Sequence, residues 1–310
     1  MRTTAIRFKN IAWDNAGILH FPAGFDQDKK YPTVVTMHPI GSCKEQTAGN
    51  VYGKALAEAG FLVLAFDASF QGESGGTPRY IENPYQRTDD VRCAIDYLET
   101  LPYVDADKIG ILGVCGGGAY SLNIAMTERR IKAVVSITGV NFGRLLRDGF
   151  AGGRPMEVLN QIAAQRSAEA KGGDLLTINM LPESVEAGKA AGIEDIDILE
   201  ATDYYKTPRG QTVGGATSAV YSCLGVGMGW DAFYLSETLL TQPILVVVGD
   251  KPGGFGAFRD GYEIVRRAAS EKKELLVVKG YSHYDLYDKP EPVRQALEKA
   301  IPFFKENLAG

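Results

Sequence analysis

The stretch K-I-G-I-L-G-V-C-G-G-G-A-Y, residues 108–120, decides the fold of this chain. It begins with the short apolar run Ile109–Val114, which is typical of a strand buried on both faces of a sheet. Cys115 and three consecutive glycines follow, and then small and apolar residues at helical spacing. The sequence therefore predicts that the chain turns abruptly from a buried strand into a helix at Cys115.

Cys115 is the candidate nucleophile of this turn. Gly113, Cys115 and Gly117 occupy the positions of a G-x-nucleophile-x-G motif, in which the nucleophile has a strained backbone between strand and helix. Glycines are expected at the flanking positions because side chains there would collide with neighbouring elements. The N-terminus of the following helix favours a thiolate. The alternative is a small buried cysteine without a chemical role, since free cysteine is among the most buried residue types.

The rest of the chain alternates strand-like and helix-like segments around this turn. Apolar strand runs cover residues 33–37, 61–66, 131–137, 243–248 and 274–278, and helical patterns cover 52–59, 87–101, 258–269 and 292–308. This alternation predicts an α/β fold, with a mostly parallel sheet covered by helices on both faces. The C-terminal ends of the strands then meet along one edge, where ligands bind. Residues 3–8 and 17–21 predict a hairpin at the N-terminal edge.

The alternation of strands and helices stops between residues 141 and 237. Residues 156–171 and 181–191 have helical patterns, but no clear strand pattern occurs in this region. A segment of this length is too long for a simple loop in a compact domain. The sequence therefore predicts a helical cap, residues 141–237, inserted into a core of residues 1–140 and 238–310.

Composition excludes several classes of protein. The 310 residues carry a net charge of −5 with both signs interspersed, which excludes a basic surface for nucleic acid or a membrane. No apolar window is long enough to span a bilayer, and the N-terminus has no signal-peptide pattern. The four cysteines form no C-x-x-C pair, which argues against zinc and disulfides and favours a reducing cytoplasm. No ligand cluster or phosphate loop indicates a metal or a cofactor.

A cysteine nucleophile needs a base, and the chain has only three histidines. His283 follows the last strand run, and the chain order of nucleophile first and histidine last favours it as the base. His20 lies in the N-terminal hairpin, far from the strand ends. His38 opens the turn His-Pro-Ile-Gly after the first core strand, and we expect it to brace that turn.

An orienting acid and two oxyanion donors complete the predicted site. The candidate acid is Asp250, which lies in the loop after the strand run 243–248. The next strand run, 274–278, leads to His283. Asp260 and Asp285 are weaker candidates, and Asp250 could instead be a capping or turn residue. The backbone amides of Gly116 and Ile40 are the expected oxyanion donors, because they follow the nucleophile and the His38 turn.

These residues together resemble the α/β-hydrolase superfamily, and cysteine at the turn is similar to the dienelactone hydrolase branch. Residues 44–47, 71–76, 204–210 and 283–288 are similar to a group that includes fungal polyketide transferases and thiohydrolases. The resemblance extends over nearly the whole chain and implies acyl-transfer chemistry through Cys115. It also departs at one point, because such hydrolases carry the aspartate about three residues past the glycine, where this chain has Pro252.

The sequence thus favours a cofactor-independent hydrolase that cleaves an ester, lactone or thioester of a small molecule through an acyl-enzyme on Cys115. One alternative is an acyltransferase that passes the acyl group to an alcohol, because thioesters are good acyl donors. Another is a ligand receptor without catalysis on the same scaffold. Arg79, Arg87 and Arg209 could hold a substrate carboxylate or pair with loop acids. The sequence leaves the oligomeric state open, including a homodimer.

Overall fold

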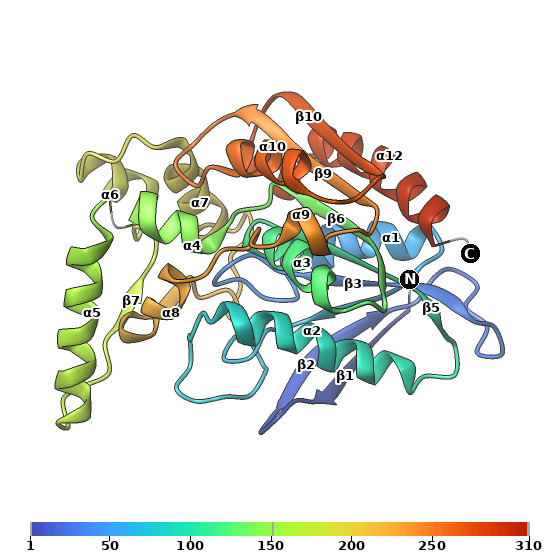
Figure 1. The fold of residues 1–310 in the computed structure, drawn as a ribbon, viewed down its shortest axis with the longest axis horizontal. Coiled ribbons are helices and arrows are strands. Elements are labelled where there is room, and N and C mark those ends of the chain that lie inside the picture. Colours follow the sequence, from blue (N-terminus) through green and yellow to red (C-terminus); the bar gives the residue numbers. More distant parts are fainter. Residues whose placement is uncertain (1, 151, 309–310) are drawn as a thin grey trace.

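An eight-stranded sheet forms the centre of the molecule in the computed structural model, which describes residues 2–150 and 152–308 (Figure 1). The strands are β1 (Thr3–Lys9), β2 (Asp14–His20), β3 (Tyr31–Met37), β4 (Leu62–Phe66), β5 (Val104–Val114), β6 (Ile131–Ile137), β9 (Ile244–Lys251) and β10 (Lys273–Ser282). They lie in the order β1-β2-β4-β3-β5-β6-β9-β10. The pairs β1–β2 and β2–β4 are antiparallel and the other pairs are parallel, which confirms the predicted α/β fold.

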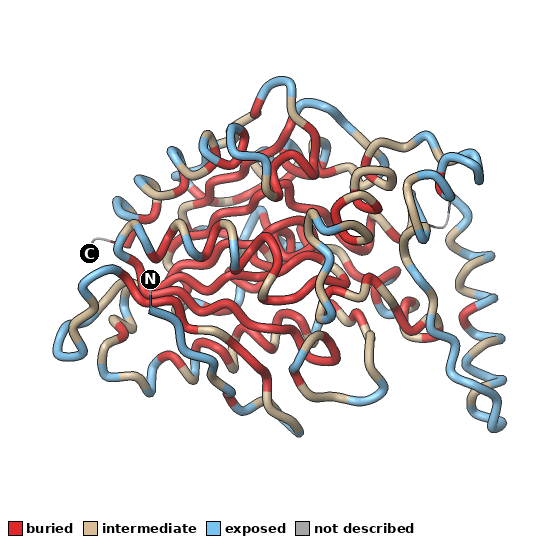
Figure 2. The backbone as a smooth tube through the Cα atoms, turned by 180° about the vertical axis from the view of Figure 1, so that it is seen from behind, coloured by how far each residue is buried: buried red, intermediate tan, exposed pale blue. Residues whose placement is uncertain are grey.

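Alternate residues of each strand pack into two separate cores, one on each face of the sheet. In β3, Val35 belongs to one core and Val34 to the other. The first core contacts α2 (Pro84–Glu99), α3 (Gly116–Thr127) and α10 (Ala257–Arg267), and the second contacts η1 (Thr47–Gly53), α1 (Lys54–Glu58) and α12 (Pro290–Asn307). Figure 2 shows the buried backbone running through the sheet between exposed helical surfaces. The continuous apolar runs of the strands follow from this burial on both faces.

The insertion between β6 and β9 is helical, as predicted, but it also contains two short strands. Its elements are α4 (Phe142–Arg144), η2 (Leu145–Phe150), α5 (Pro155–Ala170), β7 (Thr177–Asn179), α6 (Val185–Ala190), α7 (Ile196–Lys206), β8 (Ser218–Val220), η3 (Tyr221–Cys223), α8 (Gly225–Met228) and α9 (Ser236–Leu239). Strands β7 and β8 form an antiparallel pair that the sequence did not predict. Helix α6 begins later than predicted because Ser184 caps it by accepting a hydrogen bond from Ala187 N.

Helices α5, α6, α7 and α8 lie at the end of the molecule opposite the chain termini (Figure 1). Helix α5 is mostly exposed, and Ile162 is its one buried residue (Figure 2). Across residues 2–150 and 152–308, no helix is both long enough and apolar enough to cross a bilayer. We refer to residues 141–237 as the cap, with the boundaries that the sequence predicts.

Candidate active site

Cys115 lies at the abrupt turn between β5 and α3, as the sequence predicts. Its backbone has φ 55° and ψ −126°, a left-handed conformation that is strained for a residue with a side chain. Two hydrogen bonds of 3.0 Å hold it, from Cys115 N to Ile137 O and from Val140 N to Cys115 O. A Cβ on Gly113 would collide with the carbonyl of Gly117, which is why this crossing of strand and helix requires glycine. The turn is therefore fixed by contacts with the neighbouring strand β6.

The Cys115 side chain borders a cavity of about 350 Å³ beneath the cap. The core contributes Ile40 and Phe255 to its wall, and the cap contributes Met180 and Leu224. Most of the remaining wall is also aliphatic or aromatic. Cys115 itself is only 5% exposed, so a bound molecule would meet the sulfur in largely apolar surroundings.

The two amides predicted as oxyanion donors lie next to Cys115. A Cβ on Gly116 would be 3.5 Å from Ile40 N, which places the two residues in contact. Within the part of the chain that the structure describes, neither amide donates to a backbone carbonyl. Burial raises the pKa of Cys115, and a hydrogen bond from the Gly116 amide to the sulfur opposes that shift. Both amides are therefore available to a negatively charged oxygen beside the sulfur.

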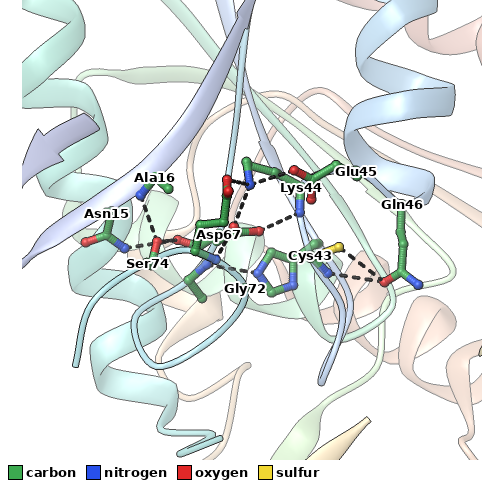
Figure 3. Close-up of polar contacts among 12 residues, drawn as sticks. Asn15, Ala16, Cys43, Lys44, Glu45, Gln46, Asp67, Gly72 and Ser74 are labelled. Atoms are coloured by element: carbon green, nitrogen blue, oxygen red, sulfur yellow. Dashed lines mark hydrogen bonds and ion pairs between the residues drawn. The ribbon is translucent and has the colours of Figure 1, made fainter. Parts of the chain in front are cut away.

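A buried ion pair fixes the turn that carries Ile40. The Asp67 carboxylate, just after β4, accepts hydrogen bonds from Lys44 N at 2.8 Å, Lys44 Nζ at 2.8 Å and Glu73 N at 2.9 Å. Asp67 is fully buried and Lys44 is 3% exposed. Burial raises the pKa of Asp67, and the Lys44 ammonium and these hydrogen bonds oppose that shift. Figure 3 shows how Ser74 and Asn15 also bind the Asp67 backbone carbonyl, so this cluster joins the loops after β3 and β4.

His38 braces the same turn, as expected. Its Nδ1 lies 2.7 Å from Pro39 O, and its Nε2 accepts a hydrogen bond of 3.0 Å from Ala68 N. The Arg87 guanidinium binds the His38 carbonyl and lies against the ring. Burial and the charge of Arg87 lower the pKa of His38, so the ring is neutral. Both ring nitrogens are occupied, and His38 has no free nitrogen for a base.

His283, the predicted base, lies in the loop between β10 and α11 (Asp285–Asp288) and is 4% exposed. Its Nδ1 is 2.8 Å from Thr138 Oγ1. Its Nε2 has no hydrogen-bond partner among the described residues, so no bond to Cys115 is formed in the free protein. Burial lowers the pKa of His283 to about 3, which keeps the imidazole neutral. A neutral imidazole with one free nitrogen can accept a proton.

Asp250 does not contact His283, and its assignment as the orienting acid is corrected here. Asp250 is an exposed residue within β9, and its carboxylate accepts a hydrogen bond of 2.6 Å from Gly280 N in the adjacent strand. The partner of His283 Nδ1 is the neutral hydroxyl of Thr138. Asp250 falls outside the site because β9 continues through it and its carboxylate binds the backbone of the neighbouring strand β10.

The two weaker acid candidates also bind other groups. Asp260 is buried and forms an ion pair of 2.7 Å with Arg144. Asp285 pairs with Lys289, and its other oxygen accepts a hydrogen bond of 3.0 Å from Ser282 N. Neither of these carboxylates therefore orients the base.

The candidate arginines are engaged by the protein itself. Arg79 donates to the carbonyl of Gly72 at 2.6 Å, and Arg209 forms an ion pair of 2.7 Å with Asp288. With Arg87 bound to His38, each of the three has an internal partner. None of the three lines the cavity beside Cys115.

Three tyrosines lie around the sulfur, and no sequence motif identified them as site residues. Tyr205, Tyr284 and Tyr287 are buried and border the cavity together with Cys115. The hydroxyls of Tyr205 and Tyr287 form no hydrogen bond of normal geometry in the described residues. The Tyr287 hydroxyl is nevertheless close enough to lower the pKa of Cys115, but burial dominates and raises that pKa to about 11. Cys115 is therefore protonated at neutral pH, in contrast to the thiolate that the helix N-terminus led us to expect.

The cap supplies a buried carboxylate that no sequence motif indicates. Asp197, in α7, is 1% exposed and accepts a hydrogen bond of 2.9 Å from Phe255 N. Its second oxygen has no partner in the described chain. A Cβ on Gly253 would collide with this carboxyl group, so glycine allows the cap to approach the loop after β9. Burial raises the pKa of Asp197 to about 7.

Comparisons with known proteins agree with this architecture. The model of the dienelactone hydrolase family matches residues 20–156, which include Cys115. The uncharacterized protein YcjY of Escherichia coli is 38% identical over 297 residues, covering 94% of each chain. The crystal structure of hypothetical protein PA2218 from Pseudomonas aeruginosa superimposes with a TM-score of 0.86 at 30% identity, covering 99% of this chain and 94% of that one. A thiohydrolase of Eupenicillium brefeldianum is 22% identical over 266 residues, 84% of this chain and 82% of that one. The chain therefore belongs to the dienelactone hydrolase family of α/β hydrolases.

Proposed function

We propose that this protein cleaves an ester or thioester of a small molecule through an acyl-enzyme on Cys115. One observation carries the proposal: Cys115 is held at a strained turn, beside two amides without backbone acceptors, at the wall of an apolar cavity. A residue without a chemical role would have no need of this strained backbone or of donors directed at its surroundings. Family membership supports hydrolase chemistry in general, and the assignment of the nucleophile comes from this geometry.

We infer the following steps from the chemistry of these groups. As Sγ of Cys115 attacks the carbonyl carbon, its proton passes to Nε2 of His283, and a tetrahedral intermediate forms. The amides of Ile40 and Gly116 stabilise the negative oxygen of this intermediate. The carbonyl re-forms, the bond to the alkoxide or thiolate leaving group breaks, and that group takes the proton from Nε2. Water then adds to the acyl-enzyme by the same route in reverse, releasing the acid and restoring the thiol.

The walls of the cavity favour an apolar acyl group. Leu145, Leu181 and Ile198 extend the aliphatic surface formed by the residues named above. Burial of each aliphatic carbon of a ligand against such a surface contributes about 0.8 kcal/mol to binding. The unpartnered hydroxyls of Tyr205 and Tyr287 add two donors for oxygen atoms of the substrate near the sulfur. The substrate class that fits is therefore a mainly apolar acyl group with oxygen substituents near the reacting carbonyl.

The name of one relative is consistent with thioester cleavage, since the Eupenicillium protein is a thiohydrolase. Transfer of the acyl group to an alcohol is the second candidate function. The largely buried sulfur and the apolar cavity favour it, because both limit the access of water to the acyl-enzyme. Product analysis with an added alcohol separates the two functions, since only a transferase forms a new ester in excess over the acid.

Intact-mass spectrometry tests the nucleophile. We expect a panel of aliphatic and aromatic esters and thioesters to add one acyl mass to the wild-type protein, and peptide mapping to place it on Cys115. Cys115→Ala should abolish both the adduct and turnover. Cys223→Ala is the matched control, because Cys223 is a half-buried cysteine in η3 and does not line the cavity. An adduct that persists in Cys115→Ala would contradict the proposal.

A further inference from the structure

We propose that Thr138 is the positioning residue of this active site and takes the place of a carboxylate behind His283. In this arrangement the Thr138 hydroxyl accepts a hydrogen bond from Nδ1–H of His283 and leaves Nε2 free to receive the proton of Cys115. The inference rests on the proposed function for the role of Nε2. The contact between Thr138 and His283 itself is a feature of the structure, independent of the substrate.

The first argument is the geometry of the contact. Thr138 Oγ1 and His283 Nδ1 are 2.8 Å apart, and both residues are buried, with exposures of 0% and 4%. A hydrogen bond sheltered from water is stronger than the same bond at a surface. Asp250, Asp260 and Asp285 all bind other groups, so no candidate acid competes for Nδ1. The hydroxyl is therefore the group that fixes the ring.

The second argument is the backbone of Thr138. Its φ is 45°, a left-handed value that is rare for a β-branched residue. The conformation is held by the hydrogen bond from Thr138 N to Val247 O, and by the neighbouring bond from Cys115 N to Ile137 O. Such strain persists only where surrounding contacts impose it, and it concentrates at functional sites. The same segment thus fixes the nucleophile and the partner of the base.

The third argument concerns what a neutral hydroxyl can and cannot do. It can select the tautomer of the imidazole, but it brings no negative charge to stabilise an imidazolium ion. Consistent with that, burial is the one cause acting on the pKa of His283, and no acid raises it. A thiol loses its proton far more readily than a serine hydroxyl, so a weaker base suffices. This pairing of a thiol nucleophile with a neutral positioning residue explains how the site can act without Asp250.

Long-range proton–nitrogen NMR of the histidine rings tests the tautomer directly. With only three histidines, the spectrum can be assigned by single substitutions. We expect the Nδ1–H form of His283 in the wild type and in Thr138→Ser, which keeps the hydroxyl. In the isosteric variant Thr138→Val we expect loss of that preference. His38 is the control within each spectrum, because Pro39 O and Ala68 N fix its ring separately. An Nε2–H form in the wild type, or no change in Thr138→Val, would overturn the proposal.

Kinetics supply the second readout. Loss of a buried hydrogen bond to the base should lower kcat in Thr138→Val by about 10- to 100-fold with little change in KM, and Thr138→Ser should recover most of it. If Thr138→Val does not fold, Thr138→Ala provides the same comparison with a smaller side chain. Equal rates in Thr138→Val and Thr138→Ser would also contradict the inference. Failure of the proposed function has a different signature, because the wild type itself would then form no acyl adduct.

Discussion

Two sets of buried polar groups flank Cys115, one on the β3–β4 side and one on the β6–β10 side, and they differ in their hydrogen bonding. Asp67, Lys44 and His38 fill their hydrogen-bonding positions within the loops that carry Ile40. Opposite them, His283 Nε2 and Asp197 Oδ1 are buried without a partner in the described residues. Unpaired buried groups cost stability, and proteins retain them where a ligand or a proton will occupy them. The Asp67 cluster thus holds the loop that carries Ile40, whereas under the proposed function His283 Nε2 and Asp197 Oδ1 are open to a ligand or a proton.

The largest effect we expect is on activity, from the β6–β10 side. His283→Ala should lower kcat/KM by on the order of 10³-fold, because it removes the only histidine nitrogen available as a base. Asp250→Asn should leave the rate within about 2-fold, since its carboxylate binds Gly280 N and not the base. Steady-state kinetics on any ester that the wild type cleaves measures both. Equal losses of kcat/KM in the two variants would indicate that Asp250 takes part in catalysis.

The second effect is on stability, from the β3–β4 side. Asp67→Ala should lower the free energy of unfolding by about 3–5 kcal/mol, because it removes the fully buried carboxylate that accepts from Lys44 N, Lys44 Nζ and Glu73 N. The Lys44 ammonium then keeps only Glu45 and Glu73, two partners with exposed side chains. Urea denaturation measures this loss. Glu73→Gln is the control, since Glu73 binds the same ammonium from a side chain that is 67% exposed, and its loss should cost less than about 1 kcal/mol. A small effect of Asp67→Ala would show that this side is not the rigid one.

The third effect is smaller and depends on pH. Burial raises the pKa of Asp197 to about 7 in the folded protein, against about 3.9 in the unfolded chain. The folded state therefore holds an extra proton between these values, and its stability falls as pH rises from about 4 through 7. Asp197→Asn keeps an acceptor for Phe255 N without the charge, so it should stabilise the protein at pH 8 by on the order of 1–3 kcal/mol. At pH 4 the variant and the wild type should differ little in melting temperature.

The acidic neighbours Asp195 and Glu200 also raise the pKa of Asp197. Both are present in the wild type and in Asp197→Asn, so their effects cancel when the two stabilities are compared. A gain of equal size at both pH values would indicate that the asparagine improves packing or hydrogen bonding. In that case the pKa of Asp197 would be the same in the folded and the unfolded protein, and the unpartnered oxygen would need another explanation.

The sequence predicted the parts of this molecule that depend on local pattern. Buried strands of a parallel sheet are continuous apolar runs, so β3, β5 and β6 could be located, and the glycines around Cys115 located the turn. His283 followed from chain order. Asp250 was predicted to lie in the loop after β9, but β9 extends through it. The sequence pattern does not determine the last residue of a strand. Thr138 is the one polar residue directly after the β6 run, at the sheet edge where ligands bind, and that position was a usable signal.

The remaining site residues could not be found because their roles depend on contacts between distant segments. Asp197 meets Phe255 across 58 positions of the chain, and nothing in the sequence around α7 indicates that contact. The tyrosines at 284 and 287 were visible in the sequence, but their position beside the cavity with Cys115 depends on how the β10–α11 segment packs against the rest of the fold. Tertiary packing of the cap on the core, and not local propensity, decides these positions.

The buried thiol of Cys115 has a consequence for the lifetime of the protein under oxidising conditions. Peroxide and alkylating reagents attack the thiolate, and a cysteine whose pKa is raised to about 11 is almost wholly protonated at neutral pH. With 5% of its surface exposed beneath the cap, the sulfur is also shielded from dissolved oxidants. Under the proposed function, Cys115 would lose its proton only when a carbonyl carbon and a base are both in place, which would spare it from sulfenic and sulfinic acid formation between turnovers.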